Sequence, residues 1–243
     1  MMNDSLSQKY DRDFIAKNIM GPNPMKIAEE LLAMEPLKED MTVLDLGCGH
    51  GVTSVFLAKE YGLKVFAVDL WISPTDNKKT FDEMGLTNEQ IIPLKGEAHD
   101  LPFAEEFFDA AVSIDSYHYF GRDKTYLNQH LLPLVRCGGY LLLAFPGLKK
   151  DIHDNIPSEM LLSWTAEDIE TLHDMDYWKN IIGSAEGAEL LTVWEMECFE
   201  ESWNDWLSCD NKYAVNDRKS MEAGAGKYMN IIAMILRKSQ NPK

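Results

Sequence analysis

The stretch Val43-Leu-Asp-Leu-Gly-Cys-Gly-His-Gly51 decides the fold of this chain. Its first half has the composition of a short buried strand, and three glycines, each separated by one residue, follow it. Because glycine has no Cβ, the backbone can turn tightly there and approach a ligand closely. Residues 52–61 then have the composition of a helix, which Gly62 ends. This order predicts one unit of an open parallel sheet, with a ligand beyond the carboxyl end of the strand.

A second apolar segment, 65–70, carries Asp69 eighteen residues after Gly51. An acidic residue at about this spacing reaches the hydroxyls of a ribose, so the pair predicts a nucleoside site. The dinucleotide pattern GxGxxG needs glycine at position 52, and valine stands there, which argues against a nicotinamide dehydrogenase. Asp45, two residues before the first glycine, suits a cationic ligand better than a pyrophosphate. A nucleoside that carries a sulfonium and an ammonium is such a ligand.

Strand-like and helix-like segments alternate from Met41 to Phe145, and most of the strands are continuous apolar runs. Such runs are expected when helices cover both faces of a sheet. We therefore predict an α/β fold with a doubly wound, mostly parallel sheet. The expected strands are 41–46, 65–70, 90–94, 107–114, 140–145, 188–196 and 228–236. The expected helices are 4–20, one that begins at Met25, 52–61, 74–85, 124–136 and 199–207, with an irregular helical stretch at 149–180.

The composition limits the partners and the compartment. The chain has 243 residues, 45% of them hydrophobic, which is enough for one domain with an elaboration. A net charge of −17 repels phosphate backbones and anionic lipids, so we expect neither a nucleic acid nor a membrane as partner. The four cysteines are scattered without a CxxC pair, which predicts reduced thiols and no metal site. The first 21 residues lack the pattern of a secretory signal, so a cytoplasmic location is expected.

Five segments together resemble the motifs of class I S-adenosylmethionine (SAM)-dependent methyltransferases. Residues 43–51 and 65–70 are similar to the first two motifs, and 96–103 (GEAHDLPF) is similar to the family's GDAxxLPF segment, with Glu97 in place of the usual aspartate. Residues 108–115 and 136–143 match the fourth and fifth strands. The resemblance covers roughly Met25 to Phe145 and is nearest to the small-molecule branch, which includes quinone-biosynthesis and amine methyltransferases. It implies a Rossmann-like sheet with an antiparallel last strand.

The resemblance also implies a set of residues for SAM and for its product S-adenosylhomocysteine. In this reading Gly47 and Gly49 approach the methionine part, and Asp45 helps to hold its amino group. Asp69 takes both ribose hydroxyls. Leu70 packs on the adenine, although Trp71 is an alternative there and could equally be a plain aromatic residue at the rim. The cofactor-binding set is Asp45, Gly47, Cys48, Gly49, Asp69, Leu70, Glu97, Ala98 and Asp115, with Cys48 included as a packing residue of the turn.

The methyl acceptor is expected at the end of the fourth strand, where Asp115 to Gly121 form an aromatic and polar cluster. His118 titrates near neutral pH if it is unperturbed, so it is a candidate for removing a proton from the acceptor. Tyr117 is the second catalytic candidate. The alternative is that the tyrosines of the cluster pack under a lid and that His118 is a structural histidine.

The acidity of the chain is concentrated in one segment. Between Asp151 and Asp210 there are 16 acidic residues and one basic residue, Lys179, together with five of the six tryptophans. Because carboxylates and aromatic faces attract cations, one hypothesis is a lid over an amine or another cationic acceptor. The alternative is a solvated acidic face with tryptophans in the core. We expect a single domain over 1–243, with a helical gate (1–24), a SAM-binding core (25–146) and lid insertions (147–187 and 197–226).

The predicted function is transfer of the SAM methyl group to a small molecule by direct displacement. The sulfonium is already an activated donor, so the main task of such a protein is alignment in a dry site. Two other functions stay open at this point: a non-catalytic SAM-binding regulatory protein, and an enzyme like cyclopropane-fatty-acid synthase. A homodimer is also left open.

Overall fold

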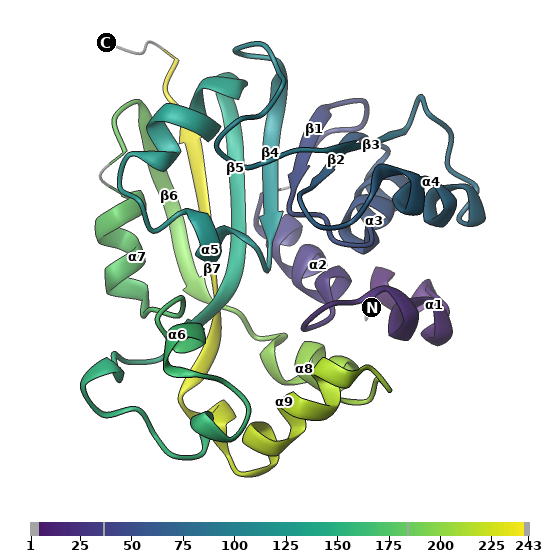
Figure 1. Cartoon of the computed structure of the whole chain (residues 1–243). Coiled ribbons are helices and arrows are strands. Elements are labelled where there is room, and N and C mark those ends of the chain that lie inside the picture. The colour runs from purple at the N-terminus through teal and green to yellow at the C-terminus, as the bar shows by residue number, and fades with distance from the viewer. Residues whose placement is uncertain (1–4, 36, 184, 241–243) are drawn as a thin grey trace.

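The computed structural model describes residues 5–35, 37–183 and 185–240, which form one twisted sheet flanked by helices (Figure 1). The strand order is β3-β2-β1-β4-β5-β7-β6. The first five strands are parallel, and β7 runs antiparallel between β5 and β6. The predicted fold class, with its antiparallel last strand, is confirmed. The strands are β1 (Thr42–Leu46), β2 (Lys64–Asp69), β3 (Ile91–Lys95), β4 (Phe108–Ile114), β5 (Val135–Leu148), β6 (Ala188–Glu195) and β7 (Met229–Lys238).

Both faces of the sheet are buried, as continuous apolar strands predict. Successive side chains of β1 point to opposite faces: Val43 joins one hydrophobic core, and Leu44 and Leu46 join the other. Figure 1 shows α2 and α3 on one side of the sheet and α7 on the other. The α-helices are α1 (Arg12–Asn18), α2 (Pro24–Met34), α3 (Val52–Tyr61), α4 (Pro74–Glu83), α5 (Tyr117–Phe120), α6 (Ala166–Ile169), α7 (Met175–Ile182), α8 (Phe199–Leu207) and α9 (Lys212–Glu222).

Two predicted helices are wrong in their extent. The helix expected at 4–20 is a 3₁₀ turn at Leu6–Lys9 followed by α1, and residue 4 lies outside the described residues. The break has a local cause, because the Asp11 side chain accepts hydrogen bonds from the amides of Asp13 and Phe14 and so starts a new helix.

The helix expected at 124–136 is a π turn at Leu127–Leu131 and a 3₁₀ turn at Leu132–Leu134. Pro133 has no amide hydrogen and cannot continue an α-helix, and β5 begins directly afterwards. The helix α9 was not predicted from the sequence. No helix among the described residues is long and apolar enough to cross a membrane.

The start of α2 is fastened to α8. The Asn23 amide donates to the Ser202 carbonyl (2.9 Å), and the Asn23 side chain donates to Asp205 (2.7 Å). Lys26 pairs with the same carboxylate at 3.1 Å. Further along α2, Glu30 accepts from the Trp194 indole at 3.0 Å. These bonds fix the N-terminal segment, residues 18–24, against the C-terminal part of the chain.

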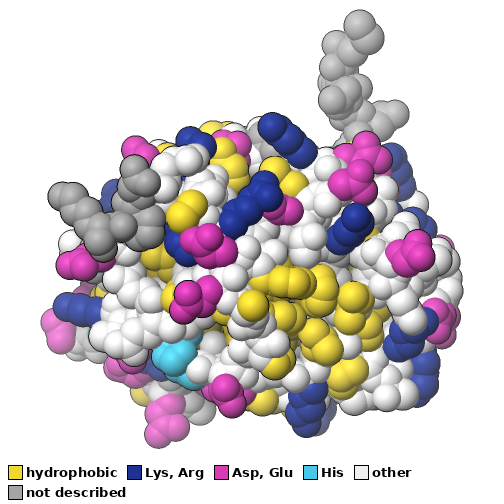
Figure 2. All heavy atoms as spheres, turned by 90° about the horizontal axis from the view of Figure 1, so that it is seen from above, with side chains coloured by type: hydrophobic (Ala, Val, Ile, Leu, Met, Phe, Trp, Pro, Cys, Tyr) yellow, Lys and Arg dark blue, Asp and Glu magenta, His cyan; other side chains and the backbone are white. Residues whose placement is uncertain are grey.

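The surface mixes both signs of charge with apolar areas. Figure 2, a view from above, shows a gathering of hydrophobic side chains among scattered acidic and basic ones. Aromatic rings also cluster at the end of the sheet near β2, where Phe66 lies within 5.6 Å of both Phe103 and Phe107, measured between ring centroids. Phe107 is 45% exposed.

Candidate active site

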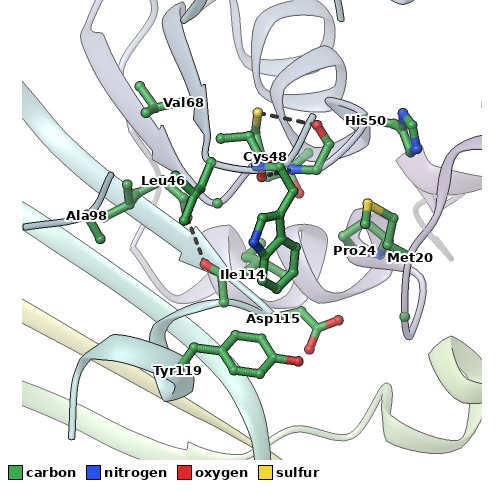
Figure 3. A pocket seen from close by; sticks show the side chains of 18 of the residues that line it. Met20, Pro24, Leu46, Cys48, His50, Val68, Ala98, Ile114, Asp115 and Tyr119 are labelled. Carbon is green, nitrogen blue, oxygen red and sulfur yellow. Dashed lines mark hydrogen bonds between the residues drawn. The ribbon is translucent and has the colours of Figure 1, made fainter. Parts of the chain in front are cut away.

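A cavity of about 380 Å³ lies at the carboxyl ends of β1, β2 and β4 (Figure 3). This is the edge where ligands bind in open α/β sheets. Its walls come from the glycine turn after β1, the end of β2, residues 96–99 and the residues after β4. The N-terminal segment supplies the remaining wall, with Asn18 to Pro22 and Pro24.

The glycine turn has the conformation that the sequence predicts. Gly47, Gly49 and Gly51 have φ values of 79°, 54° and 81°, a region that residues with a Cβ rarely adopt. A Cβ at position 47 would collide with the Ser116 side chain from the neighbouring strand. The Gly47 amide donates to the Val68 carbonyl at 2.8 Å. The turn therefore lies close to both neighbouring strands, and its backbone faces the cavity.

Asp69 connects the two halves of the nucleoside site. Its carboxylate lines the cavity and accepts hydrogen bonds from the amides of Gly49 (2.8 Å), Trp71 (2.7 Å) and Ile72 (2.8 Å). A carboxylate offers about four acceptor positions, so this one retains room for a hydroxyl donor. The Asp69 side chain thus connects the glycine turn to the loop after β2 by hydrogen bonds.

Asp45 does not reach the cavity. It is 1% exposed and accepts a hydrogen bond from the Ser54 hydroxyl of α3 at 2.5 Å. Burial is the main cause that raises its pKa to about 7, and the nearby Asp69 adds to the rise, whereas the Ser54 bond opposes it. The side chain points behind the turn and ties β1 to α3, so the help expected from it in holding an amino group would be indirect.

The remaining expected cofactor residues line the cavity: Cys48, Leu70, Glu97, Ala98 and Asp115. Leu70 is 46% exposed. Glu97 is held by its neighbour His99, whose ring nitrogen Nδ1 lies 2.8 Å from the carboxylate. This hydrogen bond is the main cause that lowers the pKa of Glu97. His99 also lines the cavity, and sequence reasoning did not single it out.

Tyr117 and His118 are the clearest correction. Neither lines the cavity; Tyr117 is 0% exposed and packs on Phe145, and His118 is 2% exposed. Burial lowers the pKa of His118 to about 3, so its ring is neutral at pH 7. The short helix α5 turns both side chains into the protein and instead presents Tyr119 to the cavity, 53% exposed. The packing alternative therefore describes these two residues.

Asp115, Tyr119 and Trp71 line one end of the cavity, next to the end of β4. Asp115 has a φ of 58°, in the left-handed region. Burial, with a smaller effect from Asp217, raises its pKa to about 7. The rings of Trp71 and Tyr119 lie 6.0 Å apart at 65°. In Figure 3, Asp115 and Tyr119 lie at one end of the cavity, and Cys48 and Val68 lie at the other.

The tryptophans of the acidic segment are structural. None of the five lines the cavity, and Trp178, Trp206 and Trp203 are 0%, 1% and 5% exposed. The indoles of Trp164 and Trp206 both donate to Asp217 of α9, each at 2.9 Å. Two of the five tryptophans therefore share one carboxylate, whereas Trp194 donates to Glu30 and Trp178 packs on Phe145 in the other core. Within the described residues, no group of three or more histidine, cysteine, aspartate or glutamate side chains could hold a metal ion.

Comparison with known proteins finds similarity to methyltransferases over part of the chain. Residues 43–139 match a family model described as a methyltransferase domain. The fatty-acid O-methyltransferase of Mycolicibacterium smegmatis is 29% identical over 145 residues, which cover 57% of this chain and 51% of that protein. The 2-methyl-6-phytyl-1,4-hydroquinone methyltransferase of Synechocystis is 33% identical over 113 residues, 46% of this chain and 34% of that protein. The chain thus spans about half, or less, of the length of these curated relatives.

Solved structures extend the likeness to most of the chain. The putative sarcosine dimethylglycine methyltransferase of Galdieria sulphuraria has a TM-score of 0.67 at 20% identity and covers 90% of this chain and 87% of that one. The phosphoethanolamine N-methyltransferase 2 of Haemonchus contortus, solved with SAM, has a TM-score of 0.72 at 17% identity and covers 97% of this chain and 59% of that one. At these identities the likeness shows the fold.

Proposed function

We propose that this chain is a class I SAM-dependent methyltransferase that transfers the methyl group of SAM to a small molecule, because residues 43–139 match a methyltransferase-domain model. The observation that carries the proposal is the left-handed glycine turn locked to the Asp69 carboxylate at the carboxyl ends of β1 and β2. This edge presents backbone groups and one carboxylate to a nucleoside-sized cavity.

In this proposal each part of SAM has a place. The methionine part lies along Gly47 and Gly49, and a ribose hydroxyl donates to the remaining acceptor position of Asp69. The adenine lies between Leu70 and the backbone of Glu97 and Ala98, which line the same end of the cavity. Asp45 acts indirectly, by holding β1 to α3 through Ser54. The product of transfer is S-adenosylhomocysteine.

The chemistry asks mainly for alignment. A neutral nucleophilic atom of the acceptor forms a bond to the methyl carbon while the carbon–sulfur bond breaks, and the electron pair of that bond stays on sulfur. An acceptor that arrives as an ammonium ion has no lone pair, so its nitrogen first loses a proton to solvent. The positive charge then passes from sulfur to the methylated nitrogen. The sulfonium thereby becomes a neutral thioether. The protein contributes by orienting the two reactants and by excluding water. The N-terminal segment, fastened to α8 through Asn23, supports this second role because it forms a wall of the cavity.

For the acceptor we propose an amine or another cationic metabolite. The support is electrostatic: burial, with the charges of Asp115, Asp168 and Asp217 as smaller causes, raises the pKa of Tyr119 to about 12, so carboxylates lie near this ring. Such a surrounding favours a positive ligand over an anion. The name of the Galdieria neighbour, a putative sarcosine dimethylglycine methyltransferase, points to the same class of acceptor.

The test is release of S-adenosylhomocysteine from SAM with a panel of acceptors: sarcosine, dimethylglycine and phosphoethanolamine as amines, and a phenol and a fatty acid as uncharged and anionic acceptors. We expect turnover with at least one amine and none with the fatty acid. Turnover with the phenol alone would sink the amine proposal but leave methyl transfer standing. SAM binding without turnover on a broad panel would favour a regulatory protein, and binding of NADH in place of SAM would refute the function altogether.

A further inference from the structure

The backbone of Asp115 is held in an uncommon conformation. Directly after β4, its φ is 58°, a value that few residues other than glycine adopt, with asparagine, aspartate and histidine the usual exceptions. Its amide is fixed by a hydrogen bond of 2.8 Å to the Ala144 carbonyl of β5. Strained positions of this kind cluster at binding sites, where the surrounding structure maintains them. The position of this side chain at the cavity is therefore set by the sheet.

The carboxylate of Asp115 differs from those of Asp45 and Asp217, the two other aspartates whose pKa is raised. Asp45 receives a hydrogen bond from Ser54, and Asp217 receives two from indoles. Within residues 5–35, 37–183 and 185–240, no hydrogen bond or ion pair reaches the Asp115 carboxylate. Asp115 is partly exposed at the cavity, and a carboxylate that is mostly withdrawn from water without a partner is less favourable in its ionised form. Burial accordingly raises the pKa of Asp115 to about 7, and a ligand that donates hydrogen bonds or carries positive charge would restore the missing interaction.

The N-terminal segment closes over this carboxylate. A Cβ at Gly21 would collide with an oxygen of Asp115, so the absence of a side chain at position 21 allows the segment to lie directly on it. On the cavity side stand two aromatic rings, Trp71 and Tyr119, which are 68% and 53% exposed. Exposed aromatic faces near a carboxylate form a favourable surrounding for an ammonium group.

We propose that Asp115, Trp71 and Tyr119 form the site that holds the cationic nitrogen of the acceptor, with Asp115 as its counter-ion. The inference rests on the proposed methyl transfer and names the residues that select the acceptor. The sequence predicts Asp115 as a cofactor residue. Its contact with Gly21 and the electrostatic effect of Asp217 instead place it at the end of the cavity next to the N-terminal segment. It is a specificity residue and takes no part in breaking the carbon–sulfur bond.

Calorimetry on the full chain saturated with S-adenosylhomocysteine tests this site. The probes are choline, a quaternary ammonium, and 3,3-dimethylbutan-1-ol, its uncharged carbon analogue, both at pH 8, where Asp115 is ionised. We expect choline to bind at least tenfold more tightly than the alcohol. Asp115→Asn should remove this preference, and Trp71→Ala should reduce the affinity for choline severalfold. The matched control is Asp210→Asn, the same change at an exposed carboxylate outside the cavity, which should keep the full preference.

Several results would overturn the assignment. Equal affinities of choline and the alcohol in the unmodified protein would do so, as would an Asp115→Asn variant that keeps the preference. A third is that Asp115→Asn weakens SAM but not S-adenosylhomocysteine and leaves choline binding intact, because the carboxylate would then serve the sulfonium. Failure of S-adenosylhomocysteine itself to bind would instead refute the proposed function, so the two failures are distinguishable.

Discussion

The two ends of the cavity differ in how their polar groups are satisfied. At the cofactor end, Asp69 accepts three backbone hydrogen bonds and Asp45 accepts one from Ser54, so the chain itself completes the geometry. At the acceptor end, Asp115 has no such partner among the described residues, and two large aromatic rings stand exposed beside it. The cofactor end is therefore assembled before any ligand arrives, whereas the acceptor end needs a ligand to complete it.

The largest expected effect is a loss of SAM affinity when the glycine turn at the cofactor end is changed. Gly47→Ala places a Cβ against Ser116 at a φ of 79°, so the turn must move, and we expect the SAM affinity to fall at least about 100-fold, or about 2.7 kcal/mol. Gly85→Ala is the matched control, because Gly85 also has a positive φ (72°) but nothing lies within 4 Å of its added Cβ. Calorimetry with SAM measures both variants. Similar losses in the two would mean that backbone strain, and not the closeness of the turn to β4, decides binding.

A second prediction compares the stability effect of Trp206, which bonds to Asp217, with that of Trp71, which lines the cavity. Trp206→Phe removes one of the two donors to the buried Asp217, and we expect a loss of about 2 kcal/mol in the free energy of unfolding. Urea denaturation measures this loss. The exposed Trp71, changed in the same way, should alter stability by less than about 0.5 kcal/mol. A Trp206→Phe variant as stable as the unmodified protein would contradict the structural role of the lid indoles.

The acceptor end should respond to pH near neutrality. Because the pKa of Asp115 is raised to about 7, the carboxyl is mostly neutral below that pH and ionised above it. A cation that binds only the ionised form should therefore gain affinity with rising pH, about tenfold between pH 6 and pH 8. Titrations with choline across this range measure the effect, and the Asp115→Asn variant should give a flat profile. An affinity that falls with rising pH would have the wrong sign.

The smallest expected effect concerns Tyr117, one of the two residues that the sequence offered as candidates for catalysis. The Tyr117 hydroxyl is buried without a hydrogen-bond partner, and the residue lies outside the cavity. Tyr117→Phe should therefore leave kcat within about twofold of the unmodified protein. Its free energy of unfolding should not fall, because removing this hydroxyl breaks no hydrogen bond. Steady-state kinetics and urea denaturation check this. A hundredfold loss of kcat would place the hydroxyl back in the mechanism.

The sequence could predict those features that depend on residues close together in the chain. The glycine turn and Asp69 are local patterns with a fixed spacing, and the structure places them at one edge of the cavity as expected. The buried strands could be predicted as well, because continuous apolar runs indicate strands that are buried on both faces of a sheet.

The rest depended on contacts between distant parts of the chain. Whether His118 or Tyr119 faces the cavity is decided by how the four-residue helix α5 packs on the sheet, and both residue types fit the local pattern. Asp45 looked like a ligand contact because its partner, Ser54, lies in the next element. The partner of the Trp164 and Trp206 indoles could not be predicted for the same reason. Their acceptor, Asp217, lies on α9, a helix that the sequence analysis did not predict.

The central claim is that a sulfonium nucleoside binds at the glycine turn with its ribose on Asp69. Isothermal calorimetry with SAM tests it most directly, on the unmodified chain and on Asp69→Ala. The account predicts saturable binding to one site in the unmodified chain and a loss of at least about 100-fold in the variant, because the ribose contact and the lock on Gly49 disappear together. No heat of binding in the unmodified chain, or an equal affinity in the variant, would contradict it.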